Sequence, residues 1–193
     1  MAEWILASAS PRRRELLSEL IEKFEIIPAK GEEKTEDGLP PKALVTELAK
    51  QKAREVAALP LAKGKIVLGA DTVVAFGNKI LGKPKNEADA FSMLSMLSGK
   101  THEVYTGVCL IYPTSEGVKE LALADCTCVT FNKLSDEEIL AYIATGSPMD
   151  KAGAYGIQDG GLVESIQGSF SNVVGLPVEL VKSMIERIKE ERE

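Results

Sequence analysis

The chain has 193 residues, 45% hydrophobic and 27% charged, which is enough to bury a sizeable core in one domain. Its formal charge of −6 excludes a broad surface for nucleic-acid polymers or anionic membranes, and no apolar run is as long as a membrane span. A small cluster of cations for an anionic metabolite remains compatible with this charge. We therefore expect one domain over residues 1–193 with small-molecule partners, and neither a nucleic-acid polymer nor a membrane.

The cysteines and the single histidine bear on redox setting and metals. An odd number of cysteines, three, without a secretory signal favours a reducing, cytoplasmic setting. Cys126 and Cys128 alternate along an expected strand, so they should face the same side. We expect buried thiols there rather than metal ligands. With His102 the one histidine, the usual Cys/His zinc pattern is absent, and a Ser-His-Asp triad is not expected except in its rarer variants.

The first expected elements are a strand at Trp4–Ala7, a Ser-rich turn and a helix. Ser10 suits the cap of this helix and Pro11 its first position, where a missing N–H has no cost. Arg12 and Arg13 oppose the helix dipole, which favours an anion such as phosphate among them. The alternative is that both arginines are solvated on a surface helix.

A strand at Phe24–Pro28 ends in an acidic loop, and a helix follows from Lys42 to Leu59. Glu32 and Glu33 in the loop could hold a divalent metal, because hard cations prefer carboxylate oxygens. Solvated acids are the alternative. In the helix the apolar residues recur at helical spacing, and Lys52 is on or near the polar side, where lysines usually face water.

The central stretch, residues 66–74, is typical of a buried strand and carries Asp71 within an apolar segment, where an unpaired charge is costly. The turn at Phe76–Lys79 sends the chain back, and Lys83 follows the returning strand. An acid and a cation thus come near one another. By itself, Asp71 is either a strand-end acid or a catalytic base.

The remaining elements follow in order. Asn86 is expected to cap a helix, and Glu103–Tyr112 and Val118–Phe131 are expected to form an antiparallel pair of strands. Ser135–Glu138 is a capping box that begins a further helix. The last element is an amphipathic helix that ends near Lys189.

The segment 148–161 is unusually rich in glycine, which lets the backbone approach a ligand closely. Lys151, Tyr155 and Gln158 add a cation, an aromatic ring and an amide able to read the edge of a base. A plain glycine-rich connector is the alternative.

Several cations with one or two carboxylates suit a polyphosphate held with a divalent metal. A metal on phosphate oxygens and a base that activates water would allow attack on phosphorus. Neither a P-loop nor a dinucleotide-binding G-x-G-x-x-G pattern is present in the sequence.

The same stretches resemble the Maf family of nucleoside triphosphate pyrophosphatases, with motifs in order from about residue 4 to about residue 180. The motifs are 8–17, 69–74, 82–84, 97–108, 151–158 and 172–177. The resemblance implies an α/β fold of the inosine-triphosphate-pyrophosphatase type. That fold has an elongated mixed β-sheet with flanking helices and two lobes around a central cleft. The resemblance also implies metal-dependent hydrolysis of a nucleoside triphosphate to the monophosphate plus diphosphate.

By position, the resemblance makes Asp71 the proton acceptor, and places Glu33 and Asp71 on a divalent metal, Mg²⁺ or Mn²⁺. The sequence after Gly31 departs from the family pattern, which leaves Glu32 or Glu33 open as the ligand. Thr72 and Gln158 resemble the dTTP/UTP-type subgroup, and an amide suits a uracil or thymine edge. The implied substrate-binding residues are Ser8, Arg12, Arg13, Lys52, Thr72, Lys83 and Gln158.

The leading hypothesis is therefore hydrolysis of dTTP and UTP by attack of water on the α phosphorus. Removal of non-standard nucleotides and a link to cell-division arrest are implied by the resemblance. The alternatives are a pyrophosphatase for 7-methyl-GTP or other modified nucleotides, and a non-catalytic nucleotide-binding regulator of septum formation. The sequence leaves the oligomeric state open, a homodimer included.

Overall fold

The computed structural model describes residues 3–34 and 38–192. Its strands are β1 (Trp4–Leu6), β2 (Phe24–Ile26), β3 (Ile66–Phe76), β4 (Lys79–Leu81), β5 (Thr101–Thr114), β6 (Gly117–Phe131) and β7 (Val163–Gln167). Its α-helices are α1 (Pro11–Ser18), α2 (Pro41–Ala57), α3 (Glu87–Leu97), α4 (Asp136–Ala144), α5 (Phe170–Val174) and α6 (Val178–Arg192). Short 3-10 helices are η1 (Pro60–Ala62), η2 (Ser147–Asp150), η3 (Ala152–Ala154) and η4 (Ile157–Asp159).

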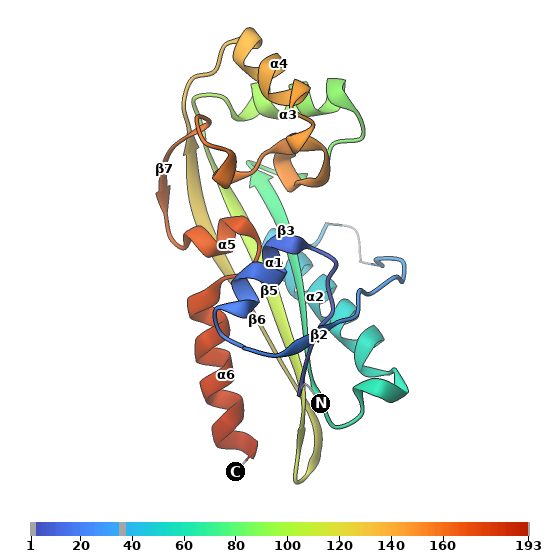
Figure 1. Ribbon diagram of the computed structural model, residues 1–193. Coiled ribbons are helices and arrows are strands. Elements are labelled where there is room, and N and C mark those ends of the chain that lie inside the picture. The colour runs from blue at the N-terminus through green and yellow to red at the C-terminus, as the bar shows by residue number, and fades with distance from the viewer. Residues whose placement is uncertain (1–2, 35–37, 193) are drawn as a thin grey trace. The chain divides into compact units, whose positions relative to one another are not determined.

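Within the described residues, the strands form one seven-stranded sheet with helices packed against it (Figure 1). The order is β2-β1-β3-β5-β6-β7, and β4 pairs with β3 outside this path. Pairing of β1 with β2 and with β3 is parallel, whereas β4 and β7 pair antiparallel to their neighbours. The expected α/β fold with a mixed sheet is confirmed.

Residue contacts divide the chain into two compact units. The first contains the residues up to Asp71, Thr106–Asp125 and the residues from Gly175 on. The second contains Thr72–Tyr105 and Cys126–Val174. Strands β3, β5 and β6 contribute residues to both units. A single domain over residues 1–193 stays a prediction.

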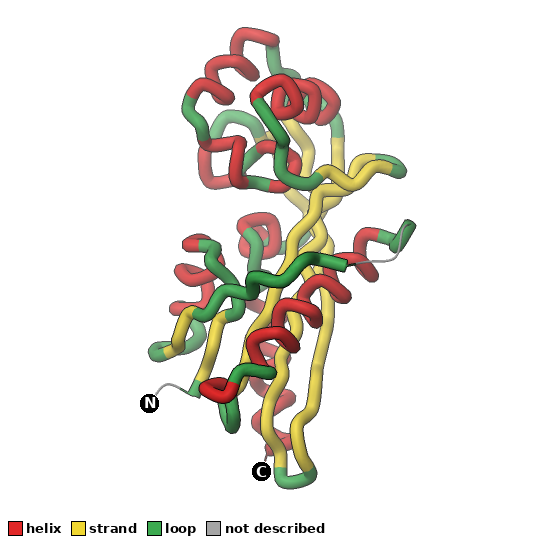
Figure 2. The backbone as a smooth tube through the Cα atoms, turned by 90° about the vertical axis from the view of Figure 1, so that its right-hand side faces the viewer, coloured by secondary structure: helices red, strands yellow, loops and turns green. Residues whose placement is uncertain are grey.

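In the first unit the sheet is covered on both faces, because successive strand residues point to opposite sides. Leu6 and Leu68 belong to a core cluster with α1 and α6, whereas their neighbours Ile5 and Val67 belong to a cluster with α2. Figure 2 shows α2 as a long helix running beside these strands. By the same alternation, Asp71 lies on the α2 side of β3.

The second unit has its own core. The hairpin of β3 and β4 has the predicted turn and pairs Val74 with Leu81, and both residues join the core with α3 and α4. Ser135 begins α4 with the predicted capping box, accepting from the Glu138 N–H at 3.2 Å and donating its own N–H to the Glu138 carboxylate at 2.7 Å.

One expectation from the sequence was wrong. Cys126 is exposed and Cys128 is part-exposed, although both were expected to be buried, whereas Cys109 is buried. The two cysteines lie on the outer side of β6, whose other side contributes Val129 to the core. Strand β7 and helix α5 lie in a segment for which the sequence predicted no element.

His102 of β5 is buried in the second unit, with 2% of its surface exposed. Its Nε2 forms a 2.8 Å hydrogen bond with the Tyr155 hydroxyl, and its ring packs edge-on against Phe131 and Tyr155. Within the described residues Nδ1 has no hydrogen-bond partner. Burial therefore lowers the pKa of His102 to about 4.

This histidine is expected to make the protein sensitive to mild acid. The unfolded chain, with a histidine pKa of about 6.5, binds a proton that the folded chain excludes, so stability is lost as pH falls from 6.5 towards 4. Between pH 7 and pH 5 the loss from this group is about 2 kcal/mol. Urea unfolding of the wild type and His102→Gln at both pH values measures it. Equal losses in the two proteins would show that the ring is not responsible.

Candidate active site

The turn between β1 and α1 is built around Arg13. Ser10 caps α1 as predicted, and its hydroxyl accepts from the Arg13 N–H at 3.4 Å. The Ser8 hydroxyl accepts from the Ser10 N–H at 3.2 Å and from Arg13 Nη1 at 3.3 Å. Arg13 Nε donates to the Gly175 carbonyl at 2.8 Å. The guanidinium is therefore fixed on two sides in the first unit.

Lys52 connects two carboxylates. Its ammonium contacts Asp71 Oδ1, and lies 2.9 Å from Glu33 Oε1. The Asp71 and Lys52 side chains are 13% and 20% exposed, whereas that of Glu33 is 54% exposed. The buried acid of the central strand is thus paired, and Glu33 is the loop acid that joins it. This contact favours Glu33 over Glu32 as the second carboxylate of the site.

The two glycines Gly69 and Gly107 allow Lys52 to reach Asp71. A Cβ on Gly69 would lie 2.5 Å from the Ala49 carbonyl oxygen, and a Cβ on Gly107 would lie 2.2 Å from that of Val45. Backbone of α2 therefore lies directly against β3 and β5, which only glycine permits at these positions. This close approach places Lys52 against Asp71.

The charges of Asp71 and Arg13 act on one another. Burial raises the pKa of the Asp71 carboxyl, and the positive charges of Lys52 and Arg13 oppose that rise. Burial lowers the pKa of Arg13, and the Asp71 charge opposes this effect. A buried carboxylate among cations is an arrangement that active sites use for proton transfer, although structural ion pairs share it.

The other predicted site residues lie in the second unit or at the start of α1. Thr72 follows Asp71 in β3 and so points to the opposite face of the strand. Lys83 is exposed just after β4, and Gln158 is exposed in η4. Arg12 is half-buried beside Arg13.

The three side chains singled out in the Gly-rich segment fall into two groups. Tyr155 is 5% exposed and bonded to His102, so it is part of the core. The Lys151 ammonium donates to the Ser147 carbonyl at 2.6 Å and contacts Asp150 at 2.9 Å. Gln158 is the one of the three that is exposed.

Sequence reasoning missed the carbonyl of Gly175 as the partner of Arg13. The motif 172–177 was singled out by resemblance, but a backbone oxygen gives no sequence signal of its own. The same holds for Gly69 and Gly107, whose role depends on contacted residues of α2 that are 16 residues or more away in the sequence.

Comparison with known proteins supports the resemblance to the Maf family over nearly the whole chain. The sequence pattern of the family described as Maf-like protein matches residues 3–188. The chain belongs to the Maf family. A dTTP/UTP pyrophosphatase of Agathobacter rectalis is 51% identical over 193 residues, with 92% of this chain and 93% of that protein covered.

Two further relatives carry the same name. A dTTP/UTP pyrophosphatase of Thermococcus kodakarensis is 52% identical over 179 residues, with 92% of each chain covered. One of Bdellovibrio bacteriovorus is 47% identical over 190 residues, with 95% of this chain and 97% of that protein covered. In the described part of this Maf chain, no helix is long and apolar enough to span a bilayer.

Proposed function

We propose that this protein hydrolyses nucleoside triphosphates, dTTP and UTP in particular, to the nucleoside monophosphate and diphosphate. The observation that carries the proposal is the buried Asp71, held by Lys52 and joined through it to Glu33. The names of the relatives, three of them at 47–52% identity, support the choice of substrates.

In the proposed reaction, a water oxygen attacks the α phosphorus and Asp71 accepts the proton. The bond between the α phosphorus and the bridging oxygen breaks, and diphosphate leaves with that oxygen. Lys52, Arg13 and Ser8 offer donors to phosphate oxygens, which carry increased charge in the transition state. The hydrogen bonds of Arg13 to the Gly175 carbonyl and the Ser8 hydroxyl hold its guanidinium in place before substrate arrives.

We also propose that Arg12, Thr72, Lys83 and Gln158 bind substrate. Arg12 and Lys83 supply positive charge for phosphates, and Gln158 supplies an amide for the base. Gln158 and Lys83 are both exposed and so are accessible to a ligand.

The residues present fit a divalent metal, Mg²⁺ or Mn²⁺. Glu33 and Asp71 direct oxygens at one point, the Lys52 ammonium, and hard cations take such oxygens. In residues 3–34 and 38–192, no three acidic, histidine or cysteine side chains gather as a site. Mg²⁺ commonly uses one or two carboxylates and completes its shell with water and phosphate oxygens. When bound, the metal would neutralise charge on the triphosphate.

The proposal is tested by measuring diphosphate release from dTTP, UTP, CTP, GTP and 7-methyl-GTP, each with Mg²⁺, with Mn²⁺ and with a chelator. The expected result is highest kcat/KM for dTTP and UTP, and activity that is lost with the chelator. Highest activity on 7-methyl-GTP would contradict the substrate assignment. Tight nucleotide binding with no turnover under any metal would instead identify a regulator.

Glu33→Gln and Glu32→Gln form a matched pair in the same assay. Glu33→Gln is expected to raise the metal concentration needed for half-maximal activity at least about tenfold, because it removes one of two anionic oxygens. Glu32→Gln is expected to behave as the wild type. The reverse result would assign the metal ligand to Glu32. A cytoplasmic setting and a homodimer stay predictions.

A further inference from the structure

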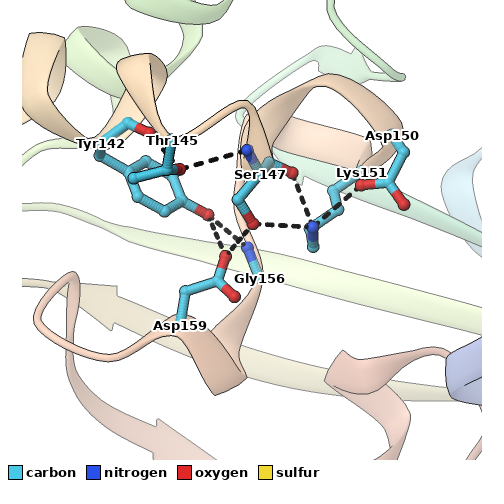
Figure 3. Close-up of polar contacts among 7 residues, drawn as sticks. All are labelled: Tyr142, Thr145, Ser147, Asp150, Lys151, Gly156 and Asp159. Carbon is cyan, nitrogen blue, oxygen red and sulfur yellow. Dashed lines mark hydrogen bonds and ion pairs between the residues drawn. The ribbon is translucent and has the colours of Figure 1, made fainter.

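A network of polar contacts surrounds the turn that carries Gln158 (Figure 3). It lies within the second unit and connects the end of α4 with η2 and η4. Its members are Tyr142, Thr145, Ser147, Asp150, Lys151, Gly156 and Asp159. Gln158 itself is not among them, and its side chain is exposed.

The hydroxyl of Tyr142 contacts both ends of this turn. It donates to Asp159 Oδ2 at 2.5 Å and accepts from the Gly156 N–H at 3.0 Å. The turn is closed by the Asp159 N–H, which donates to the Gly156 carbonyl at 3.1 Å. Gln158 lies between these two residues, so its backbone is fixed on either side by one side chain from α4.

A second set of contacts holds Asp159, which accepts the hydrogen bond of the Tyr142 hydroxyl, in place. The Ser147 hydroxyl donates to the same Asp159 Oδ2 at 2.6 Å. The Lys151 ammonium in turn donates to the Ser147 carbonyl and hydroxyl at 2.6 and 2.9 Å. Space is also filled, since a Cβ on Gly156 would lie 2.8 Å from Lys151 Cε and 3.0 Å from Asp159 Oδ2.

We propose that Tyr142, Asp159 and Ser147 are positioning residues that fix the turn of Gln158 and thereby select uracil and thymine over cytosine. This inference rests on the proposed function, because it takes Gln158 as the residue that reads the base. None of the three needs to touch the substrate. They act through the backbone at Gly156 and Asp159.

The chemistry of the bases explains why fixing the turn would matter. Thymine and uracil present a carbonyl acceptor where cytosine presents an amino donor. A glutamine amide has both a donor and an acceptor, so by rotation it can satisfy either base. Discrimination therefore improves when the amide can approach the base from one direction only. A fixed turn sets the position of the Gln158 Cα and Cβ and so limits how the amide can approach the base, whereas a loosened turn would widen that choice and would also pay its ordering entropy when substrate binds.

The test compares Tyr142→Phe with Tyr112→Phe. Both changes delete a hydroxyl that donates to a carboxylate, but Tyr112 donates to Glu191, at 2.8 Å in the first unit. The kcat/KM for UTP divided by that for CTP is expected to fall about 5–10-fold in Tyr142→Phe, through the KM for UTP. Tyr112→Phe is expected to keep the wild-type ratio. Thermal midpoints of both variants are measured in parallel.

A second pair of variants tests Asp159, the acceptor of the Tyr142 hydrogen bond. Asp159→Asn retains an oxygen for the Tyr142 hydroxyl and is expected to keep most of the selectivity, whereas Asp159→Ala is expected to lose it. Hydrogen exchange of the Gly156 amide gives a readout that does not depend on turnover. It is expected to accelerate in Tyr142→Phe and Asp159→Ala.

The outcomes distinguish a failure of this inference from a failure of the proposed function. A wild-type ratio in Tyr142→Phe, or an equal loss of activity on UTP and CTP, would overturn the positioning role while leaving the enzyme assignment intact. A wild type that neither hydrolyses nor binds these nucleotides would overturn the proposed function and this inference together. Faster Gly156 exchange with a lower UTP/CTP ratio would support the inference.

Discussion

Asp71→Asn is expected to lower kcat for dTTP and UTP about 10²–10⁴-fold, the usual contribution of a positioned general base. Asparagine has nearly the same shape and can still hydrogen-bond Lys52, but its amide cannot accept a proton from water. Binding of the nucleotide should change much less than turnover. Diphosphate release under saturating substrate measures kcat, and calorimetric titration measures binding.

Asp136→Asn is the matched control, because Asp136 is an exposed acid in the first turn of α4. It should retain wild-type kcat. Undiminished turnover in Asp71→Asn would refute Asp71 as the proton acceptor. Loss of nucleotide binding with unchanged kcat would instead assign Asp71 a role in holding substrate.

Gly107→Ala is expected to reduce the free energy of unfolding by about 3 kcal/mol, the upper part of the usual range for overpacking. The added methyl group would lie 2.2 Å from the Val45 carbonyl oxygen, which is backbone and cannot rotate away. The helix α2 would have to move, and Lys52 would move with it. Activity should therefore fall even at temperatures where the variant is fully folded.

Gly82→Ala is a suitable control for this substitution. No atom lies within 4 Å of a Cβ at Gly82, so the change should alter stability little. Urea unfolding followed by Trp4 fluorescence compares the two variants. If Gly107→Ala were as stable as Gly82→Ala, α2 could not lie as close to β5 as the structure shows.

Features set by a few neighbouring residues were predictable. Ser10 and Pro11 begin α1 as expected, and Ser135 with Glu138 begins α4. The hairpin turn at Gly77 also lies where the sequence placed it. Each of these signals depends on backbone groups within one turn, so the local sequence contains the whole interaction.

Features that depend on distant partners were not predictable in the same way. Alternation placed Cys126 and Cys128 on one side of a strand but could not say which side the core would cover. The Gly-rich segment offered three candidate functional residues, and only the fold shows Tyr155 packed on His102 and Lys151 held by Ser147. Contacts between residues far apart in the sequence decide burial, and burial separates Gln158 from the others.

The positions of Asp71 and Thr72 in β3 limit which insertions and deletions the chain can tolerate. The two side chains are adjacent in sequence but point to opposite faces of one strand. Substitution at either position leaves the other where it is. Insertion or deletion of one residue earlier in β3 would turn both side chains to the opposite face of the strand. Every core residue of β3 between the changed position and Asp71 would turn with them. Length changes are therefore tolerable in the β5–β6 turn, where Glu116 is exposed, but not in β3.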